Sequence, residues 1–241
     1  MTKKNPREGQ PLLSAKEFVS QLTILKSINN NTRYFKGEDK DNKFLNVRMA
    51  NIFSLAKQFS QMPLTEVDKL FASNYYEVRM GAVSIMDFKA RDKKISQEMR
   101  KQLFDLYLKR HDRINNWDMV DRAAPFVVGG YLFDKSRRPL YKLAISKNVW
   151  ERRTAIVSTY FFIRQNDIDD TFGIAELLVD DEHELVNKAV GSWIREAGKR
   201  NKPKLLRFLD QHAATMPRVT LRYAIEKLDK KQKDFFMKAG E

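Results

Sequence analysis

The feature that most constrains the fold of this chain is a helical pattern that recurs along it. Five segments open with a charged or capping turn and then carry an alanine, and the spacings between these alanines are 42, 31, 34 and 35 residues: Ala82, Ala124, Ala155, Ala189 and Ala224. Shorter amphipathic segments precede four of them, at 64–71, 140–144, 171–178 and 205–212. This period is typical of stacked helix pairs, as in HEAT or armadillo arrays.

A single helix pair cannot cover its own apolar face, so neighbouring pairs stack, and a small alanine lets two helices approach closely. We therefore predict an all-α fold, a right-handed α-solenoid of HEAT-like helical repeats with a concave basic groove lined by the second helices. Residues 1–13 are expected to be a flexible tail and 14–241 a single repeat domain, with a polar connecting loop at 29–43. The alternative is a helical domain without repeats.

Charge and composition restrict the partners and the chemistry. The 241 residues carry a net charge of +14, so a polyanion is the expected partner, either nucleic acid or an anionic membrane surface. The absence of Cys excludes disulfides, Cys-ligated zinc, iron–sulfur clusters and Cys nucleophiles. Nine Gly without a phosphate-cradling motif argue against a nucleotide cofactor. No apolar run reaches the roughly 18–20 residues of a membrane span, and no secretory signal is seen, so a cytoplasmic monomer without a membrane partner is expected.

Basic residues fall near the starts of the second helices. If the repeats stack in register, these side chains form a stripe on one face, which suits a phosphate backbone. For each one taken alone, the alternative is a solvated cation that pairs with a nearby Asp or Glu. The residues are Arg79, Arg152, Arg153, Lys188, Arg218 and Arg222.

The segment 115–122, NNWDMVDR, carries the second signal. Asn115 or Asn116 is a good N-cap, after which Trp117 and Asp121 lie four residues apart on one helical face. A first-turn acid such as Asp118 is often only a partner of the helix dipole. A carboxylate within a phosphate-binding groove opposes binding, so Asp121 there calls for a chemical reason. The alternative for Asp121 is a buried structural pair with an arginine.

The three histidines offer no zinc-site spacing, and no metal site is predicted. Each is expected to be a surface or capping residue: His111, His183 and His212.

Three segments together resemble the AlkD-type DNA alkylation repair proteins, which are alkylpurine DNA glycosylases built of HEAT-like repeats. They are NNWDMVDRAAPFVVGGYLFDK, NVWERRTAIVSTYFFIRQ and KAVGSWIREAGKR, and the likeness extends over about 44–238. The resemblance implies that Asp121 is the catalytic carboxylate and that Trp117 lines the lesion site. It also implies that Arg153 lies near the DNA backbone.

The chain departs from the family pattern at one position. The family has a Trp directly after the Lys-Ala-x-Gly segment, where this chain has Ser192, and its own Trp follows at Trp193. One step along a helix is a rotation of about 100°. Either Trp193 faces elsewhere and one wall of the lesion site is missing, or the helix is locally adjusted and Trp193 still forms that wall.

The resemblance implies an enzyme that removes positively charged N3- or N7-alkylated purines from double-stranded DNA by hydrolysis of the N-glycosidic bond. Asp121 would stabilise the oxocarbenium-like sugar and orient water, and no metal or other cofactor would be needed. The main alternative is a non-catalytic HEAT-like repeat protein that binds damaged, bent or branched DNA. A protein–protein scaffold is a further alternative.

Overall fold

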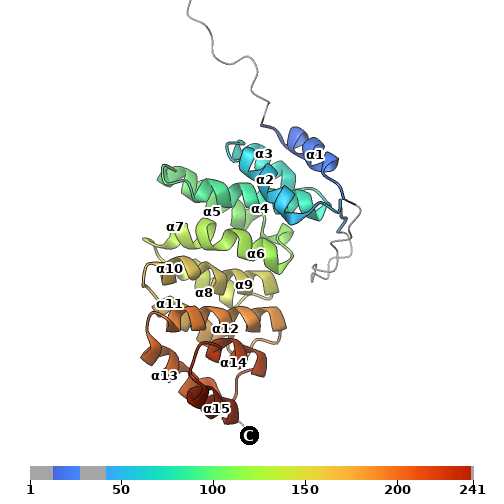
Figure 1. Ribbon diagram of the computed structural model, residues 1–241. Coiled ribbons are helices and arrows are strands. Elements are labelled where there is room, and N and C mark those ends of the chain that lie inside the picture. The colour runs from blue at the N-terminus through green and yellow to red at the C-terminus, as the bar shows by residue number, and fades with distance from the viewer. Residues whose placement is uncertain (1–12, 28–41, 240–241) are drawn as a thin grey trace, which may run out of the picture. The chain divides into compact units, whose positions relative to one another are not determined.

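The computed structural model describes residues 13–27 and 42–239 (Figure 1). In these residues the secondary structure is helical, with two isolated bridges, Lys26 to Val47 and Lys43 to Tyr75, in place of any strand. The expected tail at 1–12 and most of the expected loop, 29–41, lie outside the described residues. The chain divides into two compact units, residues 1–89 and 90–241. The single domain expected over 14–241 stays a prediction, and each unit is described by itself.

Within residues 13–27 and 42–90, the structure describes the helices α1 (Ala15–Ile24), α2 (Met49–Gln58), α3 (Leu64–Phe71) and α4 (Tyr76–Ala90). The Ser14 hydroxyl accepts a hydrogen bond from the Glu17 amide (3.2 Å) and so caps the start of α1. The Phe18 ring is fully buried and meets the Phe59 ring edge-on, with centroids 5.3 Å apart. The helix predicted at 64–71 matches α3 residue for residue.

The second unit is a stack of helices with short connections. In chain order they are α5 (Gln97–Lys109), a 3-10 turn η2 (His111–Arg113), α6 (Trp117–Ala123), a π-helical turn η3 (Ala124–Gly129), α7 (Gly130–Leu132), α8 (Arg138–Ala144), α9 (Val149–Ser158), α10 (Tyr160–Arg164), α11 (Asp169–Leu178), α12 (Glu184–Gly198), α13 (Lys202–His212), α14 (Arg218–Ile225) and α15 (Lys230–Lys238).

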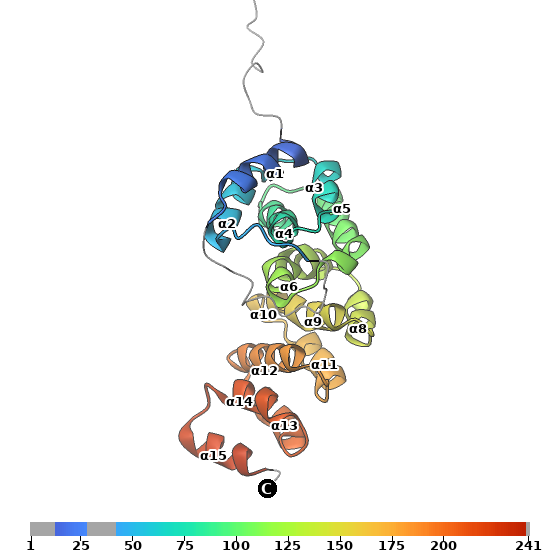
Figure 2. The same ribbon diagram turned by 90° about the vertical axis from the view of Figure 1, so that its right-hand side faces the viewer.

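The helices of this unit form two layers. The second helices α6, α9, α12 and α14 contact one another in turn, while α8 packs on α9 and α11 packs on α12. Figure 2 shows α8, α11 and α13 in one column and α9, α12 and α14 in the other. The alanines used as repeat markers in this unit, from Ala124 to Ala224, are all buried. The all-α fold of stacked HEAT-like helix pairs is therefore confirmed.

Two glycines allow the second helices to pack closely. A Cβ added at Gly129 would lie 2.2 Å from the Ser158 backbone oxygen, and one at Gly191 would lie 2.4 Å from the Thr220 oxygen. Gly129 ends the π-helical turn η3, which includes Pro125. Because proline has no N–H for the α-helical ladder, the wider turn interrupts the segment there. The sequence pattern predicts the helix in this segment but not its π-helical turn.

Adjacent glycines provide a test of this packing. We expect Gly129→Ala to destabilise the protein by about 1–3 kcal/mol, because its Cβ meets a backbone oxygen that cannot yield. Gly130→Ala is the matched control: its Cβ would be 3.4 Å from the Phe161 ring, and alanine favours a helix by up to about 1 kcal/mol. Thermal unfolding followed by circular dichroism measures both. Equal melting temperatures for the two variants would contradict the close helix contact.

Candidate functional site

The first turn of α6 is organised by Asp118. Asn116 occupies the predicted N-cap position with an extended backbone (φ −151°, ψ 156°). Its side-chain amide donates to Asp118 Oδ1 (2.8 Å), and the Met119 backbone N–H donates to the same oxygen (2.9 Å). A carboxylate in this position is also stabilised by the positive end of the helix dipole. Asp118 thus secures the start of the helix that carries Trp117 and Asp121.

Asp121 is held by a bidentate pair with Arg153. Arg153 Nε donates to Asp121 Oδ1 (3.0 Å) and Nη2 donates to Oδ2 (2.8 Å). The remaining nitrogen, Nη1, donates to the Leu185 backbone oxygen. One guanidinium on α9 therefore joins α6 on one side to α12 on the other. The structural Asp–Arg pair that the sequence left as an alternative is present.

The two members of the pair differ in exposure. The Asp121 side chain is 33% exposed, whereas that of Arg153 is 8% exposed. Arg153 Cζ also lies 6.0 Å from the centroid of the Trp117 ring, which is itself partly exposed. The structure therefore brings together three of the residues that the sequence placed at the site, Trp117, Asp121 and Arg153. The Asp121 carboxylate is partly exposed to solvent, whereas the Arg153 guanidinium that binds it is buried.

A buried polar cluster lies beside Arg153. His111 Nε2 and the Tyr107 hydroxyl both lie within hydrogen-bond distance of Thr154 Oγ1, at 2.9 and 3.2 Å. His111 is 2% exposed, so its expected place at the surface or in a cap is wrong. Burial lowers the pKa of His111 to about 4 and raises the pKa of Tyr107 well above its ordinary value. By contrast, the His183 imidazole does cap α12, accepting from the Leu185 amide (3.2 Å).

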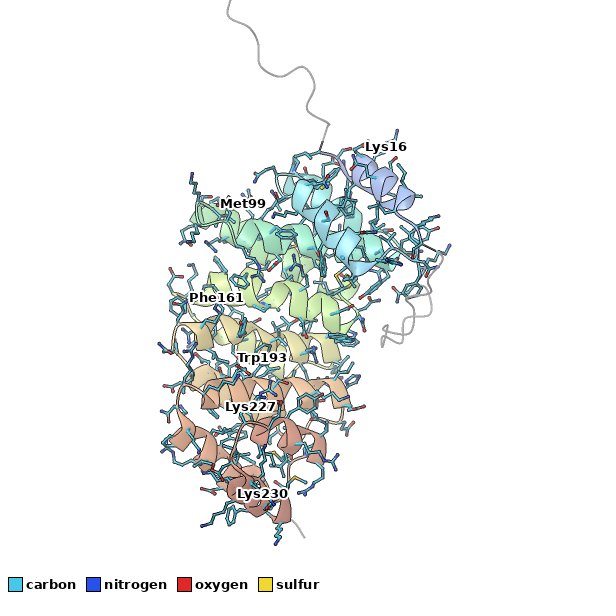
Figure 3. The ribbon with its side chains drawn as sticks, in the orientation of Figure 1. Lys16, Met99, Phe161, Trp193, Lys227 and Lys230 are labelled. Carbon is cyan, nitrogen blue, oxygen red and sulfur yellow. The ribbon has the colours of Figure 1, made fainter. Side chains whose placement is uncertain are left out.

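Trp193 packs against a neighbouring aromatic residue. Its ring lies on that of Tyr160, with centroids 4.9 Å apart and planes at 37°. Trp193 lies on α12 (Figure 3), eight residues after Leu185, which is about 12 Å along a helix. Tyr160 is the first residue of α10, which follows α9 directly. The aromatic pair thus sits about two turns along α12 from the Arg153–Leu185 contact. The role of Trp193 as a wall of the lesion site stays a prediction.

The predicted DNA-binding cations have different surroundings. Arg152 forms a bidentate pair with Asp181 (2.6 and 3.1 Å), and Lys188 pairs with Glu184 (2.5 Å). Arg218 donates to the Met237 backbone oxygen.

Arg222 is exposed on α14. Arg79 belongs to the other unit and is 1% exposed, donating to Asn42 and to the Ser73 oxygen. Its burial does not support a phosphate contact, and its role in binding DNA stays a prediction.

Several residues of this region were not predicted from the sequence. Asp181, only 4% exposed in its side chain, is the buried counter-ion of Arg152, and Thr154 and Tyr107 form the polar cluster beside Arg153. The sequence signal for Thr154 is its place directly after Arg153 on a predicted helix. Nothing in the sequence pattern points to Tyr107 or Asp181.

The described residues fit neither the role of metal ligands nor that of membrane spans. In 13–27 and 42–239, no three His, Asp or Glu side chains are grouped so that they could hold a metal ion. Across the same ranges, every helix is too short or too polar to cross a bilayer.

The fold and site define an all-α helical-repeat protein with a partly exposed carboxylate on its second-helix layer. The chain belongs to the DNA alkylation repair enzyme family, whose sequence model matches residues 19–228. That family supports a role in the repair of alkylated DNA.

Two solved structures are similar in fold. One is a predicted DNA alkylation repair enzyme from Enterococcus faecalis, with a TM-score of 0.63, 16% identity, and coverage of 90% of this chain and 97% of that one. The other is AlkD2 from Streptococcus mutans, with a TM-score of 0.55, 18% identity, and coverage of 90% and 100%. The search of curated proteins finds no match.

The buried histidine predicts a pH dependence of stability. Because folding lowers the pKa of His111 from about 6.5 to about 4, the folded protein favours the neutral imidazole. The resulting stability is full above about pH 6.5 and is lost as the pH falls toward 4, by up to about 3 kcal/mol. We expect the urea midpoint of unfolding, measured by circular dichroism, to fall less steeply with decreasing pH in His111→Gln than in the wild type. The same slope in both proteins would contradict the burial of a neutral His111.

Proposed function

We propose that this chain is a DNA glycosylase that excises positively charged N3- or N7-alkylated purines from duplex DNA. The observation that carries the proposal is the partly exposed Asp121 carboxylate, held in one orientation by Arg153 beside Trp117. Membership of the DNA alkylation repair enzyme family supports it. The net charge of +14 supports a polyanionic substrate.

The proposed reaction breaks the bond between the sugar C1′ and the purine nitrogen. The cationic purine leaves with the bonding electron pair as a neutral base, so it needs little protonation. The sugar becomes oxocarbenium-like, and a fixed anion beside C1′ stabilises that charge. Water then adds to C1′ and loses a proton, and an abasic site remains. We assign to Asp121 the stabilisation of the sugar and the orientation of this water.

The clamp on Asp121 is compatible with that role. Arg153 occupies one acceptor position on each carboxylate oxygen, whereas two carboxylate oxygens together offer about four. The open face of Asp121 therefore keeps acceptor capacity for a water molecule and for the developing positive charge. The Trp117 ring can attract a cationic nucleotide, an interaction of about 0.5–2 kcal/mol. In this account Arg153 acts on the DNA through Asp121.

A non-catalytic DNA-binding protein is the second candidate. It is favoured by the packing of Trp193 against Tyr160 and by Ser192 at the position where the family has a Trp. If that wall is missing, the groove would still bind damaged or bent DNA without excising a base. The two candidates differ in whether 7-methylguanine is released.

The decisive comparison uses two Asp→Asn changes on the same helix. Asp121→Asn should reduce the release of 7-methylguanine from duplex DNA by about 10²-fold or more, the usual cost of losing a preorganised electrostatic group. Its affinity for the duplex should be retained, since a negative charge has been removed. Asp118→Asn carries the same change in charge one turn earlier and should keep most of the activity. Excision, circular dichroism and anisotropy binding are measured for both variants. Equal excision by Asp121→Asn and the wild type would remove the catalytic assignment.

A further inference from the structure

The C-terminal part of the chain holds half of its net charge. Residues 199–241 contain twelve Lys and Arg against five Asp and Glu, a net +7 of the total +14. Only Arg218 and Arg222 of this group were assigned to DNA binding from the repeat pattern. The remaining cations lie mainly on α13 and α15 and in the turns beside them. The function proposed above does not say which of these cations contact DNA.

The last three helices carry cations at their N-terminal ends, where the helix dipole disfavours positive charge. Each of α13, α14 and α15 begins with Lys or Arg and has no acid in its first turn. In α9, α11 and α12 the first turn carries at least one acid, as helix dipoles favour. In α15 the first two residues, Lys230 and Lys231, both add positive charge to a positive helix end. The Asp229 carboxylate caps α15 by accepting from the Gln232 amide (2.9 Å), so it offsets part of this charge. Since α8 also begins with an arginine and has no acid in its first turn, the charge at the helix start does not by itself mark an anion site.

One face of α15 combines this charge with an exposed aromatic ring. Lys231, Phe235 and Lys238 follow at spacings of four and three and are all exposed, Phe235 by 65%. Lys230 and Asp234 are exposed beside them, so the face is net +2. We call these five residues the α15 face. Figure 3 labels Lys230 at the C-terminal end of the stack.

The helix α15 packs against α14, the last of the second helices. Arg218, at the start of α14, donates to the Met237 oxygen near the end of α15, so the two helices run antiparallel. Phe236 is buried, while its neighbour Phe235 points outward. From α9 to α15 there are three interhelical steps of about 8–10 Å, so this face lies on the order of 24–30 Å from Arg153. That separation makes it distinct from the candidate lesion site.

We propose that the α15 face is a second contact with the duplex, where its lysines bind backbone phosphates and Phe235 packs against deoxyribose. The inference rests on the proposed function for its choice of DNA as the polyanion. An anionic membrane is the competing partner for a basic helix. Membrane-surface helices present a broad apolar side, whereas this face has one aromatic residue among four charged ones. The composition of the face therefore favours phosphates of a nucleic acid.

The test compares two triple variants with the same loss of charge. Lys230→Gln/Lys231→Gln/Lys238→Gln alters the α15 face. Arg138→Gln/Lys142→Gln/Lys147→Gln is the matched control, since these exposed cations lie on α8 and the turn after it, and Arg138 also begins a helix. The binding of an undamaged duplex is measured by fluorescence anisotropy over a series of salt concentrations.

We expect the α15 variant to bind at least about tenfold more weakly. The slope of log K against log salt should fall by about 2–3, because each phosphate contact contributes about 0.9. The control should stay within about twofold of the wild type. Phe235→Ala should weaken binding without changing the slope. The melting temperature of the α15 variant should stay close to that of the wild type, because the helix dipole disfavours Lys230 and Lys231 at the start of α15 but favours Lys238 in its last turn.

Equal affinities and slopes for the two triple variants would overturn the inference. So would an α15 variant that loses binding to phosphatidylserine vesicles but keeps its binding to duplex. Excision separates this inference from the proposed function. If the wild type releases 7-methylguanine and the two triple variants bind alike, only the α15 face is wrong. If binding depends on the α15 face but no base is released, the second contact stands and the glycosylase proposal fails.

Discussion

The candidate site depends on one guanidinium that connects three successive second helices. Arg153 on α9 donates to both oxygens of Asp121 on α6 and to the Leu185 oxygen on α12. Arg153 is almost fully buried, so removing its carboxylate partner would leave a poorly compensated charge, at a cost that reaches about 3–5 kcal/mol for fully buried pairs. The orientation of the carboxylate is therefore tied to the packing of the stack. A site built in this way keeps its geometry without a loop or a bound ion.

Much of the fold follows from local sequence patterns. Apolar residues at spacings of three and four predicted α3 to the residue, and the alanine period predicted the layers of the second unit. Pro125 marks where the helix is interrupted, but the π-helical form of η3 could not be predicted, because the packing of Gly129 against Ser158 belongs to the folded state. The burial of His111 could not be predicted for the same reason. Charged neighbours on both sides are typical of a surface residue, yet η2 turns its imidazole onto Thr154.

The site was predictable in part. Trp117 and Asp121 share a helix, and their spacing of four is enough to place them on one face. The repeat pattern and the resemblance both pointed to Arg153, but as a contact to the DNA backbone. Whether Arg153 pairs with Asp121 depends on how α6 and α9 are aligned with each other. The spacing of residues within one helix does not determine that alignment. The same limit applies to Arg152, whose counter-ion Asp181 lies in the turn before α12. Counting charges locates a basic segment but does not show which cations are already paired.

The most direct test of this account is a double-mutant cycle on the excision rate at saturating enzyme. It compares the wild type, Asp121→Asn, Arg153→Lys and the combined variant, because lysine keeps the charge but cannot hold both carboxylate oxygens. If Arg153 acts through Asp121, Arg153→Lys alone slows excision and adds little to Asp121→Asn. Losses that multiply independently, or an Arg153→Lys protein as fast as the wild type, would contradict the central claim.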